Sequence, residues 1–506
     1  MGSESGPQTD GVIQVHGTDN VVAALRDIPT GTRFHVNGIE VVCKHDVRRG
    51  HKIAVRRLLS GESVVKYGHS IGHATQTIEP GSWVHSHNLA TNLSNIVEYS
   101  YSPVPTVLRQ TSIPPRTFRG YRRASGRVGT RNEIWIINTV GCVNTSAEKI
   151  ARRANELYRH PNVDGVFSFS HPFGCSQLGD DLANTRKVLA GLMNNPNAGA
   201  VLVLGLGCEN NQLADLLKLT GAIHPNRIRS FNSQSVDDEI ETGVQLIGEL
   251  FDYIKLDRRE ECSLADLTVA MKCGGSDGLS GITANALVGR ITDTLAAHNG
   301  RVLLSEVPEM FGAEQQLMNR AKDASVYERT VRMINNFKEY FLSHGQPVYE
   351  NPSPGNKEGG LTTLEEKSLG AVQKGGTAPV SDVLDYGEQV KERGLSLLYA
   401  PGNDGVSSTA MVASGATLFL FTTGRGTPLG FPVPTLKISS NTTLFQNKQK
   451  WIDFNAGAIV DGATTMDELT EQLLDMIVAV ASGVKMTKNE LNGYREIAIW
   501  KEGVTL

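Results

Sequence analysis

The sequence predicts an α/β protein with a small β-clip-like domain at its N-terminus, followed by a large α/β body with mostly parallel sheets. Residues 12–89 hold short β-branched runs separated by turn formers, which is typical of a small β domain. The remaining chain alternates long apolar runs with helical patterns. The run from Ala198 to Leu204 ends in Gly-Leu-Gly-Cys208-Glu209, as expected of a strand buried on both faces of a parallel sheet.

The composition excludes several classes of function. The 506 residues carry a net charge of -4 and are 40% hydrophobic. No basic run is present to bind nucleic acid, and no apolar run approaches the ~20 residues that span a bilayer. Six cysteines in so long a chain do not make a disulfide framework, so we expect reduced thiols in a cytoplasmic protein. Residues 1–11 lack the features of a secretion signal and are expected to form a disordered tail.

The first domain is expected over residues 12–89, with strands at 39–43, 63–67 and 82–85. Within this domain, only the run from Asn20 to Arg26 has a pattern that predicts a helix. Residues 90–118 contain four prolines, which disfavour helix and central strand, and are interpreted as an extended linker. The α/β catalytic region then fills residues 119–506, possibly as two lobes.

Three apolar runs end in Gly-Cys, and their cysteines, Cys142, Cys175 and Cys208, are 33 residues apart. That interval fits one strand, one helix and two short loops. A fourth run ends at Cys273, and we expect these strand ends to converge on one pocket. Two interpretations stay open: three thiols hold an iron–sulfur cluster, or Cys175, Cys208 and Glu209 line an anion-binding pocket. For any single cysteine, a small core residue is the simpler explanation.

Later apolar runs at 301–306, 395–400 and 416–421 also lead into polar residues, among them Glu306, Glu309, Asp404 and Arg425. Thr465-Met-Asp-Glu468 is a capping box, and the apolar spacing after it predicts a core-facing helix that stops near Gly483.

Several side chains suit a metal ion or an anionic ligand. His85 and His87 alternate along a strand-like run, so both side chains would face one side of it. They could bind one metal ion, with His16 as a third ligand. The alternative is that they are surface histidines, which are common. Lys357 lies in a turn-rich segment, either a surface loop or one that closes over an anionic substrate. Arginines in glycine-rich stretches and a loop of small polar residues suit a carboxylate. The candidate substrate-binding residues are Arg127, Arg131, Asn132, Ser276, Asp277, Lys357 and Arg425.

Many longer motifs together resemble one family. They include Gly50-His-Lys52, His85-Ser-His-Asn88, Gly126-Arg-Val-Gly-Thr-Arg-Asn132, Gly174-Cys-Ser-Gln-Leu-Gly-Asp180, Gly205-Leu-Gly-Cys-Glu-Asn-Asn211, Asn351-Pro-Ser-Pro-Gly-Asn-Lys357 and Thr422-Thr-Gly-Arg-Gly-Thr-Pro428. From about Val12 to Leu506 the chain resembles the altronate/galactarate dehydratases, a family shared with sulfolactate sulfo-lyases. The N-terminal part resembles a SAF (β-clip) domain.

The resemblance implies dehydration of D-altronate to 2-dehydro-3-deoxy-D-gluconate in hexuronate breakdown, with Fe(II) or Mn(II). His85, His87 and the closing residues 502–506 favour altronate over galactarate or another sugar acid. Family members often carry a cysteine where this chain has Ala371, so that position is not an essential thiol. A sulfolactate lyase is disfavoured because its two parts are usually separate chains, and a non-catalytic sugar-acid sensor is the other alternative.

The expected mechanism uses a divalent ion held by His16, His85 and His87, which stabilises the enediolate formed at C2. Arg131 and Arg425 would orient the carboxylate, with Glu209 or Lys66 as proton carriers. Cys175 and Cys208 complete the catalytic candidates. The expected partner is a small sugar acid, with no nucleic acid and no membrane, and the chain is expected to form a homo-oligomer.

Overall fold

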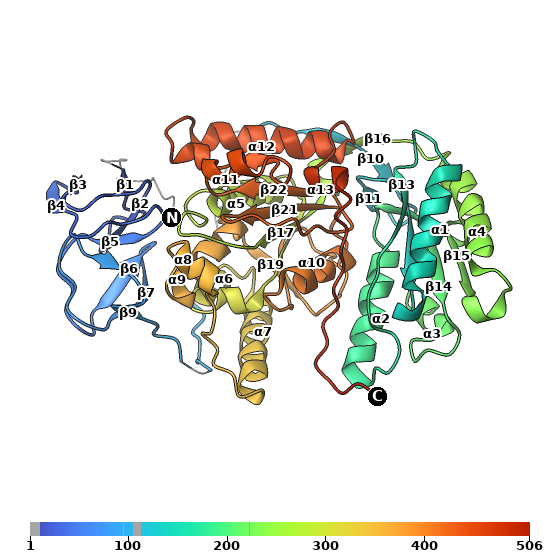
Figure 1. The fold of residues 1–506 in the computed structure, drawn as a ribbon, viewed down its shortest axis with the longest axis horizontal. Coiled ribbons are helices and arrows are strands. Elements are labelled where there is room, and N and C mark those ends of the chain that lie inside the picture. Colours follow the sequence, from blue (N-terminus) through green and yellow to red (C-terminus); the bar gives the residue numbers. More distant parts are fainter. Residues whose placement is uncertain (1–10, 95, 105–112, 222) are drawn as a thin grey trace.

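The computed structural model describes residues 11–94, 96–104, 113–221 and 223–506. Three parts lie in a row along its longest axis: the N-terminal β domain, a central body with a seven-stranded sheet, and a second α/β unit with a four-stranded sheet (Figure 1). Most of the expected N-terminal tail and the middle of the expected linker lie outside the described residues.

The N-terminal domain contains only short strands, and all its pairings are antiparallel. They are β1 Val12–Ile13, β2 Val21–Ala24, β3 Arg33–Val36, β4 Ile39–Val42, β5 Lys52–Ala54, β6 Ser63–Lys66, β7 His69–Ala74, β8 Trp83–Val84 and β9 Leu89–Ala90. The helix expected over Asn20–Arg26 is wrong. Its centre is strand β2, whose four residues are all buried between β1 and β5.

A three-stranded antiparallel sheet marks where the chain enters and leaves the second unit. It consists of β10 Thr117–Arg122, β11 Val128–Gly129 and β16 Glu260–Ser263. Gly120 of β10 lies opposite Glu260 of β16. The second unit is therefore an insertion whose two ends are neighbours.

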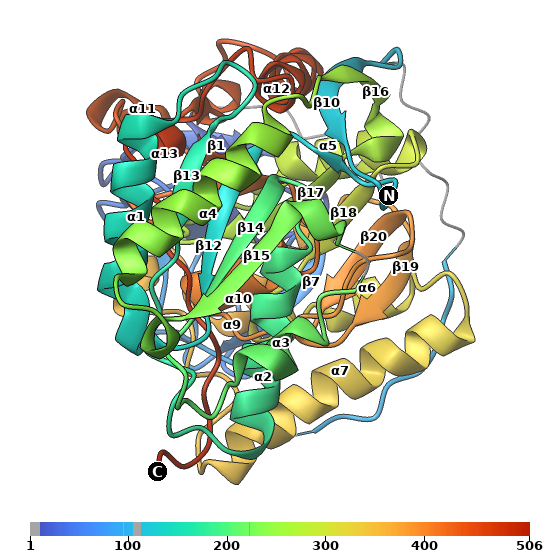
Figure 2. The ribbon, with the colours of Figure 1, turned by 90° about the vertical axis from the view of Figure 1, so that its right-hand side faces the viewer.

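The second unit has a parallel sheet in the order β13-β12-β14-β15, formed by Gly165–Ser168, Glu133–Asn138, Ala198–Gly205 and Ile228–Asn232 (Figure 2). Alternate residues of its strands serve two cores. Ile134 and Leu202 pack with helices α1 Asn144–Leu157 and α4 Glu239–Ile254. Trp135 and Val203 share a cluster with side chains of α2 Gly179–Met193; α3 is Leu213–Leu217.

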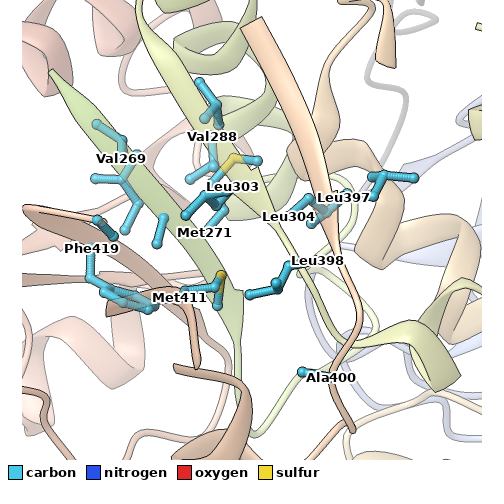
Figure 3. Close-up of a cluster of buried hydrophobic side chains, with 14 of the residues drawn as sticks. Val269, Met271, Val288, Leu303, Leu304, Leu397, Leu398, Ala400, Met411 and Phe419 are labelled. Atoms are coloured by element: carbon cyan, nitrogen blue, oxygen red, sulfur yellow. The ribbon is translucent and has the colours of Figure 1, made fainter. Parts of the chain in front are cut away.

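The body is built on a fully parallel sheet in the order β19-β20-β18-β17-β21-β22-β23. Its strands are β17 Thr268–Cys273, β18 Arg301–Leu304, β19 Val380–Leu384, β20 Gly394–Leu398, β21 Leu418–Thr423, β22 Thr435–Ser439 and β23 Phe454–Asn455. Val269 and Met271 of β17 lie among Leu303, Phe419 and Met411 in the centre of the core (Figure 3).

Helices cover both faces of this sheet. They are α5 Ala284–Ala297, α6 Glu314–Met318, α7 Ala324–Ser343, α8 Pro354–Glu358, α9 Leu364–Ala371, α10 Asp404–Ala413, α11 Thr442–Asn447, α12 Met466–Ala481 and α13 Lys488–Leu491. The predicted capping box at Thr465 is confirmed at the start of α12. Among the described residues, no helix combines the length and apolarity that crossing a bilayer requires.

The second unit docks on the body through α2 and α10. Gly191 of α2 lies so close to Ala413 of α10 that an added Cβ would come within 2.5 Å of the Ala413 carbonyl oxygen. Asn195 donates hydrogen bonds of 2.8 Å to the carbonyl oxygens of Val412 and Ala416.

The predicted α/β class, with a small antiparallel β domain at the N-terminus, is confirmed. We expected the four cysteine-bearing strand ends to converge on one pocket, but they belong to two different sheets. Cys142, Cys175 and Cys208 follow strands of the four-stranded sheet, whereas Cys273 ends β17 of the seven-stranded sheet.

Candidate functional site

The carboxyl-terminal edge of the seven-stranded sheet holds a buried cluster of charged groups, where ligands of open α/β sheets bind. Lys272, at the end of β17, contacts Glu306 and lies 2.8 Å from Asp404. Lys374 lies 3.1 Å from the second oxygen of Glu306. Both ammonium groups keep pKa values above the usual value despite burial, because Asp404 and Glu306 raise that of Lys272, and Cys273 and Glu306 raise that of Lys374.

Glu306 is the centre of this cluster. It follows β18 and adopts the left-handed conformation, with φ 71° and ψ 54°, which non-glycine residues rarely accept without a functional reason. Its side chain is 1% exposed. Burial raises the pKa of this carboxyl above its usual value, although Lys272 and Lys374 oppose the shift. A carboxyl group between two lysines is a candidate proton carrier.

Cys273 and Glu309 complete the cluster. The Cys273 Sγ lies 2.8 Å from Lys374 Nζ and 3.4 Å from Glu309 Oε2. Burial raises the pKa of the thiol to about 12, so the sulfur is protonated near neutral pH. Burial alone would raise the pKa of Glu309, but Lys367, at 2.8 Å, and the other two lysines lower it to about 2. A small cleft beside the cluster is lined by Glu306, Glu309, Lys374 and Ala371, among others.

A second ionic group fixes the N-terminal domain to the body. Glu366 of α9 pairs with Lys52 at 2.7 Å and Lys66 at 2.9 Å, and all three side chains are buried. One carboxylate cannot neutralise two ammonium groups. Accordingly, burial lowers the pKa of Lys52 to about 8, whereas the pKa of Lys66 stays above its usual value because of Glu366. Lys66 therefore acts as a docking residue in this structure.

Two neutral histidines of the N-terminal domain form hydrogen bonds with backbone carbonyl groups of α8. His85 Nε2 lies 3.0 Å from the Lys357 carbonyl oxygen, and His51 Nε2 lies 3.1 Å from that of Glu358. Burial lowers the pKa of His85 to about 4, so the ring is neutral at pH 7 and its Nε2–H donates. Thr362 Oγ1, at 3.1 Å from Nδ1, supplies the complementary donor.

Glycines allow the backbones of the N-terminal domain and the body to approach closely beside α8. Gly278 donates to the Gly359 carbonyl oxygen at 2.8 Å. A Cβ on Gly278 or Gly360 would overlap the carbonyl oxygen of Gly50, a residue with φ of +83°.

Four of the expected substrate-binding residues gather around α8. Asn356 donates to the carbonyl oxygen of Ser276 at 2.8 Å and lies 3.3 Å from Lys367, which joins α8 to the buried cluster. Arg425 pairs with Glu358 at 2.9 Å, and both side chains are exposed. Lys357, which was expected in a segment without regular structure, is instead part of α8, whose N-terminus is closed by a capping box of Ser353 and Asn356.

Asp277, the fourth, is held within its own loop. Its carboxylate accepts from Ser280 at 2.8 Å, Ser440 at 2.9 Å and Asn441 at 3.1 Å. Those hydrogen bonds order the loop after β17, so the Asp277 carboxylate has a structural role.

Arg127, Arg131 and Asn132 lie before the amino-terminal end of β12, at the opposite edge from the strand-end turns. Arg131 is 3% exposed and gives its donors to Glu490, Thr130 and Val480. Asn132 donates to Asn162 and Ile254, and Arg127 donates to the carbonyl oxygen of Val390. As hydrogen-bonded here, all three hold parts of the fold together instead of facing the buried cluster.

Glu209, Cys175 and Cys208 lie at the carboxyl edge of the four-stranded sheet. Glu209 accepts from the backbone N–H of Leu206 and Gly207 and from the Thr139 hydroxyl. These donors outweigh burial and lower its pKa, which suits a turn-closing carboxylate better than a base. Both thiols are exposed.

A divalent ion has one suitable set of donors among the described residues. The ligand atoms of Cys273, Glu306 and Glu309 lie within 4.8 Å of one another. The two carboxylates suit harder ions such as Mn(II), whereas a thiolate suits softer ions such as zinc. Three lysines currently neutralise these groups, so an ion would take over the role of at least one ammonium.

The expected histidine set does not converge in this structure. His16 is exposed beside Thr18, and exposed His87 packs against Trp83. Both ring nitrogens of His85 already have protein partners.

Sequence reasoning noted Glu306, Glu309 and Asp404 only as polar residues after strands, and it missed Lys272, Lys367 and Lys374. Position at a strand end was the available signal for Lys272. Lys367 and Lys374 come from α9 and the following turn 372–375, where no local pattern distinguishes them from surface lysines.

Family models match three consecutive parts of the chain. Residues 10–92 match the altronate/galactarate dehydratase SAF domain. Residues 120–255 match the second domain of D-galactarate dehydratase/altronate hydrolase. Residues 264–505 match the C-terminal domain of D-galactarate/altronate dehydratase.

Curated relatives match over nearly the whole length. The altronate dehydratase of Bacillus subtilis (strain 168) is 50% identical over 495 residues, which is 98% of this chain and 99% of the relative. The galactarate dehydratase (L-threo-forming) of Escherichia coli (strain K12) is 35% identical over 512 residues, 96% of each chain.

A third relative divides the match between two subunits. The beta subunit of the (2R)-sulfolactate sulfo-lyase of Chromohalobacter salexigens is 31% identical over 76% of this chain and 97% of the subunit. Its alpha subunit is 48% identical over 42 residues, 8% of this chain and 45% of the subunit.

Proposed function

The chain belongs to the altronate/galactarate dehydratase family, and on this premise we propose that it dehydrates D-altronate to 2-dehydro-3-deoxy-D-gluconate. The observation that carries the choice of substrate is the 50% identity to an altronate dehydratase, against 35% to a galactarate dehydratase. We place the reaction in hexuronate breakdown, in the cytoplasm, in a homo-oligomer.

The reaction breaks the C2–H bond and leaves its electron pair on an enediolate. Loss of the 3-hydroxyl as water then gives an enol that becomes the 2-keto acid. Lys272 and Lys374 hold two positive charges at the carboxyl edge of the sheet, where they stabilise the enediolate. Because their partners are already in place, this stabilisation needs little rearrangement.

Glu306 is the proposed proton carrier. Its pKa is raised by burial, so its carboxylate is more basic than an exposed one. The Lys374 ammonium, 3.1 Å from its Oε2, is placed to return a proton to a leaving hydroxyl. In this assignment Glu306 replaces Glu209 and Lys66, both of which are saturated by structural partners.

Arg425 and Lys357 are the proposed cations for the substrate carboxylate. Arg425 is bound to an exposed partner, Glu358, and exposed ion pairs are weak enough to be exchanged for a ligand. Ser276 lies at the same junction and offers a small polar side chain.

The proposed metal is Fe(II) or Mn(II), held by Cys273, Glu309 and one carboxylate oxygen of Glu306, whose other oxygen is left to carry the proton. When bound, the ion supplies Lewis-acid polarisation of a substrate oxygen. The thiol, protonated near neutral pH, must release its proton for the sulfur to act as a ligand.

Assays with D-altronate and galactarate test the function. Protein kept anaerobic with iron(II) is expected to release the keto-deoxy acid from altronate, and chelator is expected to stop it. Turnover of galactarate alone would change the substrate but not the chemistry. Binding of altronate without turnover would support a non-catalytic binding protein.

Metal analysis distinguishes the two possible sites. In protein loaded with manganese(II), Glu309→Gln is expected to lower the bound metal several-fold, whereas His85→Gln and His87→Gln are expected to retain it. The reverse pattern would return the metal to the histidines. Size-exclusion chromatography with light scattering tests the homo-oligomer.

A further inference from the structure

The second unit carries three exposed thiols that the proposed reaction does not use. Of the six cysteines, Cys43, Cys262 and Cys273 are buried, whereas Cys142, Cys175 and Cys208 are exposed. Free cysteine is among the most buried residue types. The exposed thiols are also the three that follow a glycine at the end of a strand.

Strand register places these thiols at the same edge. β12 lies between β13 and β14, and all three run parallel. Asn138 of β12 pairs with Leu204 of β14, and Cys142 and Cys208 each come four residues later. Ile136 pairs with Ser168 of β13, which puts Cys175 one position beyond the level of Cys142. Three neighbouring strands therefore present one thiol each at nearly one height.

Hydrogen bonds join the three turns to one another. Gly141 donates to the Phe173 carbonyl oxygen at 2.9 Å, and Asn211 donates to that of Gly174 at 2.9 Å. Ser176 donates to Asn210 Oδ1 at 2.8 Å. The thiols are thus carried by a connected framework and not by independent loops.

A buried donor without a partner lies next to this framework. Gln177, two residues after Cys175, is 1% exposed and accepts from Gly174 at 3.0 Å. Within the described part of the chain, its Nε2 has no hydrogen-bond partner. Such an amide suits an acceptor such as a sulfide or thiolate sulfur.

The three thiols do not form a compact set for a single ion. The three sulfurs are not among the described groups whose ligand atoms lie within 4.8 Å of one another. A cluster of several metal ions spans more space than one ion and accepts thiolates that are further apart.

We propose that Cys142, Cys175 and Cys208 form a site for a four-iron, four-sulfide cluster in the second unit. Each thiol loses its proton and ligates one iron through its sulfur, and the fourth iron keeps an open position. The 2+ state of such a cluster contains two iron(II), two iron(III) and four sulfide ions, so supplying both iron states from solution balances the electrons and requires no oxidation of the protein. The site is separate from the buried cluster at β17, so its test does not rest on dehydration.

Anaerobic reconstitution of the full chain, with its thiols reduced beforehand, with equal amounts of iron(II) and iron(III) and with sulfide tests the proposal. The wild type is expected to hold about four iron and four sulfide ions per chain and to show the visible charge-transfer absorption of such clusters. The variant with Cys142→Ser, Cys175→Ser and Cys208→Ser is expected to lose at least ten-fold of the sulfide and about four iron ions per chain. Cys43→Ala, which removes a buried thiol elsewhere, is expected to keep them.

Circular dichroism and melting curves verify that each variant is folded, which exposed serines should permit. Wild-type protein that takes up no sulfide-bound iron would overturn the proposal. Equal uptake by the triple variant would overturn it as well. About one zinc ion per chain, lost in the triple variant, would replace the cluster with a mononuclear site.

Discussion

Glu306 and Glu209 are both buried glutamates that follow strands of parallel sheets, yet their surroundings differ. Glu306 lies between two lysines in a left-handed backbone conformation. Glu209 accepts from the backbone of its own turn and from Thr139. The first arrangement suits proton transfer, and the second suits the closure of a turn.

Glu306→Gln is therefore expected to lower kcat by about 10²–10⁴-fold with little change in KM, because glutamine is isosteric but cannot exchange the proton. Steady-state kinetics on altronate measures this effect. Glu209→Gln is the matched control and is expected to lower stability by about 1–3 kcal/mol while sparing kcat. Equal losses of kcat in both variants would contradict the assignment of Glu306.

His85 makes the docking of the N-terminal domain sensitive to acid. Its folded-state pKa of about 4 lies below the usual 6.5. Between these values the unfolded state binds the extra proton, so stability present above pH 6.5 is lost as the pH falls towards 4.

The melting temperature of the wild type is expected to fall more steeply across this pH window than that of His85→Gln, which cannot titrate. His87→Gln, at an exposed ring on the same turn, is expected to follow the wild type. Thermal unfolding between pH 7 and pH 4 provides the measurement. Parallel curves for all three proteins would show that His85 does not control docking.

Among the elements, the loop after β17 controls how closely the N-terminal domain approaches the body. Gly278→Ala would place a methyl group against the backbone of Gly50. Overpacking of this kind costs about 1–3 kcal/mol. We expect Gly278→Ala to unfold at lower denaturant concentration and to lose activity.

Gly355→Ala provides the comparison for this change. It adds the same methyl group at the same junction, where the nearest atom is Arg425 Nε at 3.8 Å. Stability and activity are expected to stay near those of the wild type. An unchanged Gly278→Ala variant would show that the two backbones can separate without consequence.

The elements with strong local patterns could be predicted from sequence. Strand β14 and helix α12 have long apolar patterns and clear ends, so neighbours could not override them. The run Val21–Ala24 is too short for its period to identify it, and pairing on both sides made it a strand. Helix α8 was not predicted, because the prolines and glycines of its segment favour a turn-rich loop. Ser353 and Asn356 nevertheless form its N-terminal capping box.

The candidate site was only partly predictable for the same reason. A strand end is marked by an apolar run that stops at a polar residue, and two residues found in this way, Ser276 and Arg425, lie near one junction. The order of strands within sheets has no local signal, so Cys273 could not be separated from the three thiols of the other sheet. Lys367 and Lys374 reach the cluster only through tertiary packing.

At the scale of the whole molecule, the contacts between the N-terminal domain and the body are numerous enough to hold without a covalent link. They include the Lys52, Lys66 and Glu366 group and the bonds of Arg49 to Asn441 and Thr443. A family relative divides its match between two subunits.

Co-expressed fragments 1–104 and 105–506 are therefore expected to co-elute and to retain activity. Glu366→Gln is expected to weaken the pair at least ten-fold, because it leaves two buried ammonium groups without a counter-charge. Size-exclusion chromatography measures the association, with Glu358→Gln, an exposed glutamate of the same junction, as control. Fragments that elute separately would show that the chain connection is essential.

The packing of α2 on α10 has a consequence for synthesis on the ribosome. Asn195, at the end of the second unit's docking surface, and its partner Val412 are 217 residues apart in the chain. At about 5–20 residues per second, the ribosome needs roughly 10–40 s to make the intervening segment. During that time Val188 and Gly191 of α2, which approach Gly387 and Ala413 of the body, have no body to cover them. The nascent chain therefore passes through a stage in which this helix face must be shielded by chaperones or by temporary contacts.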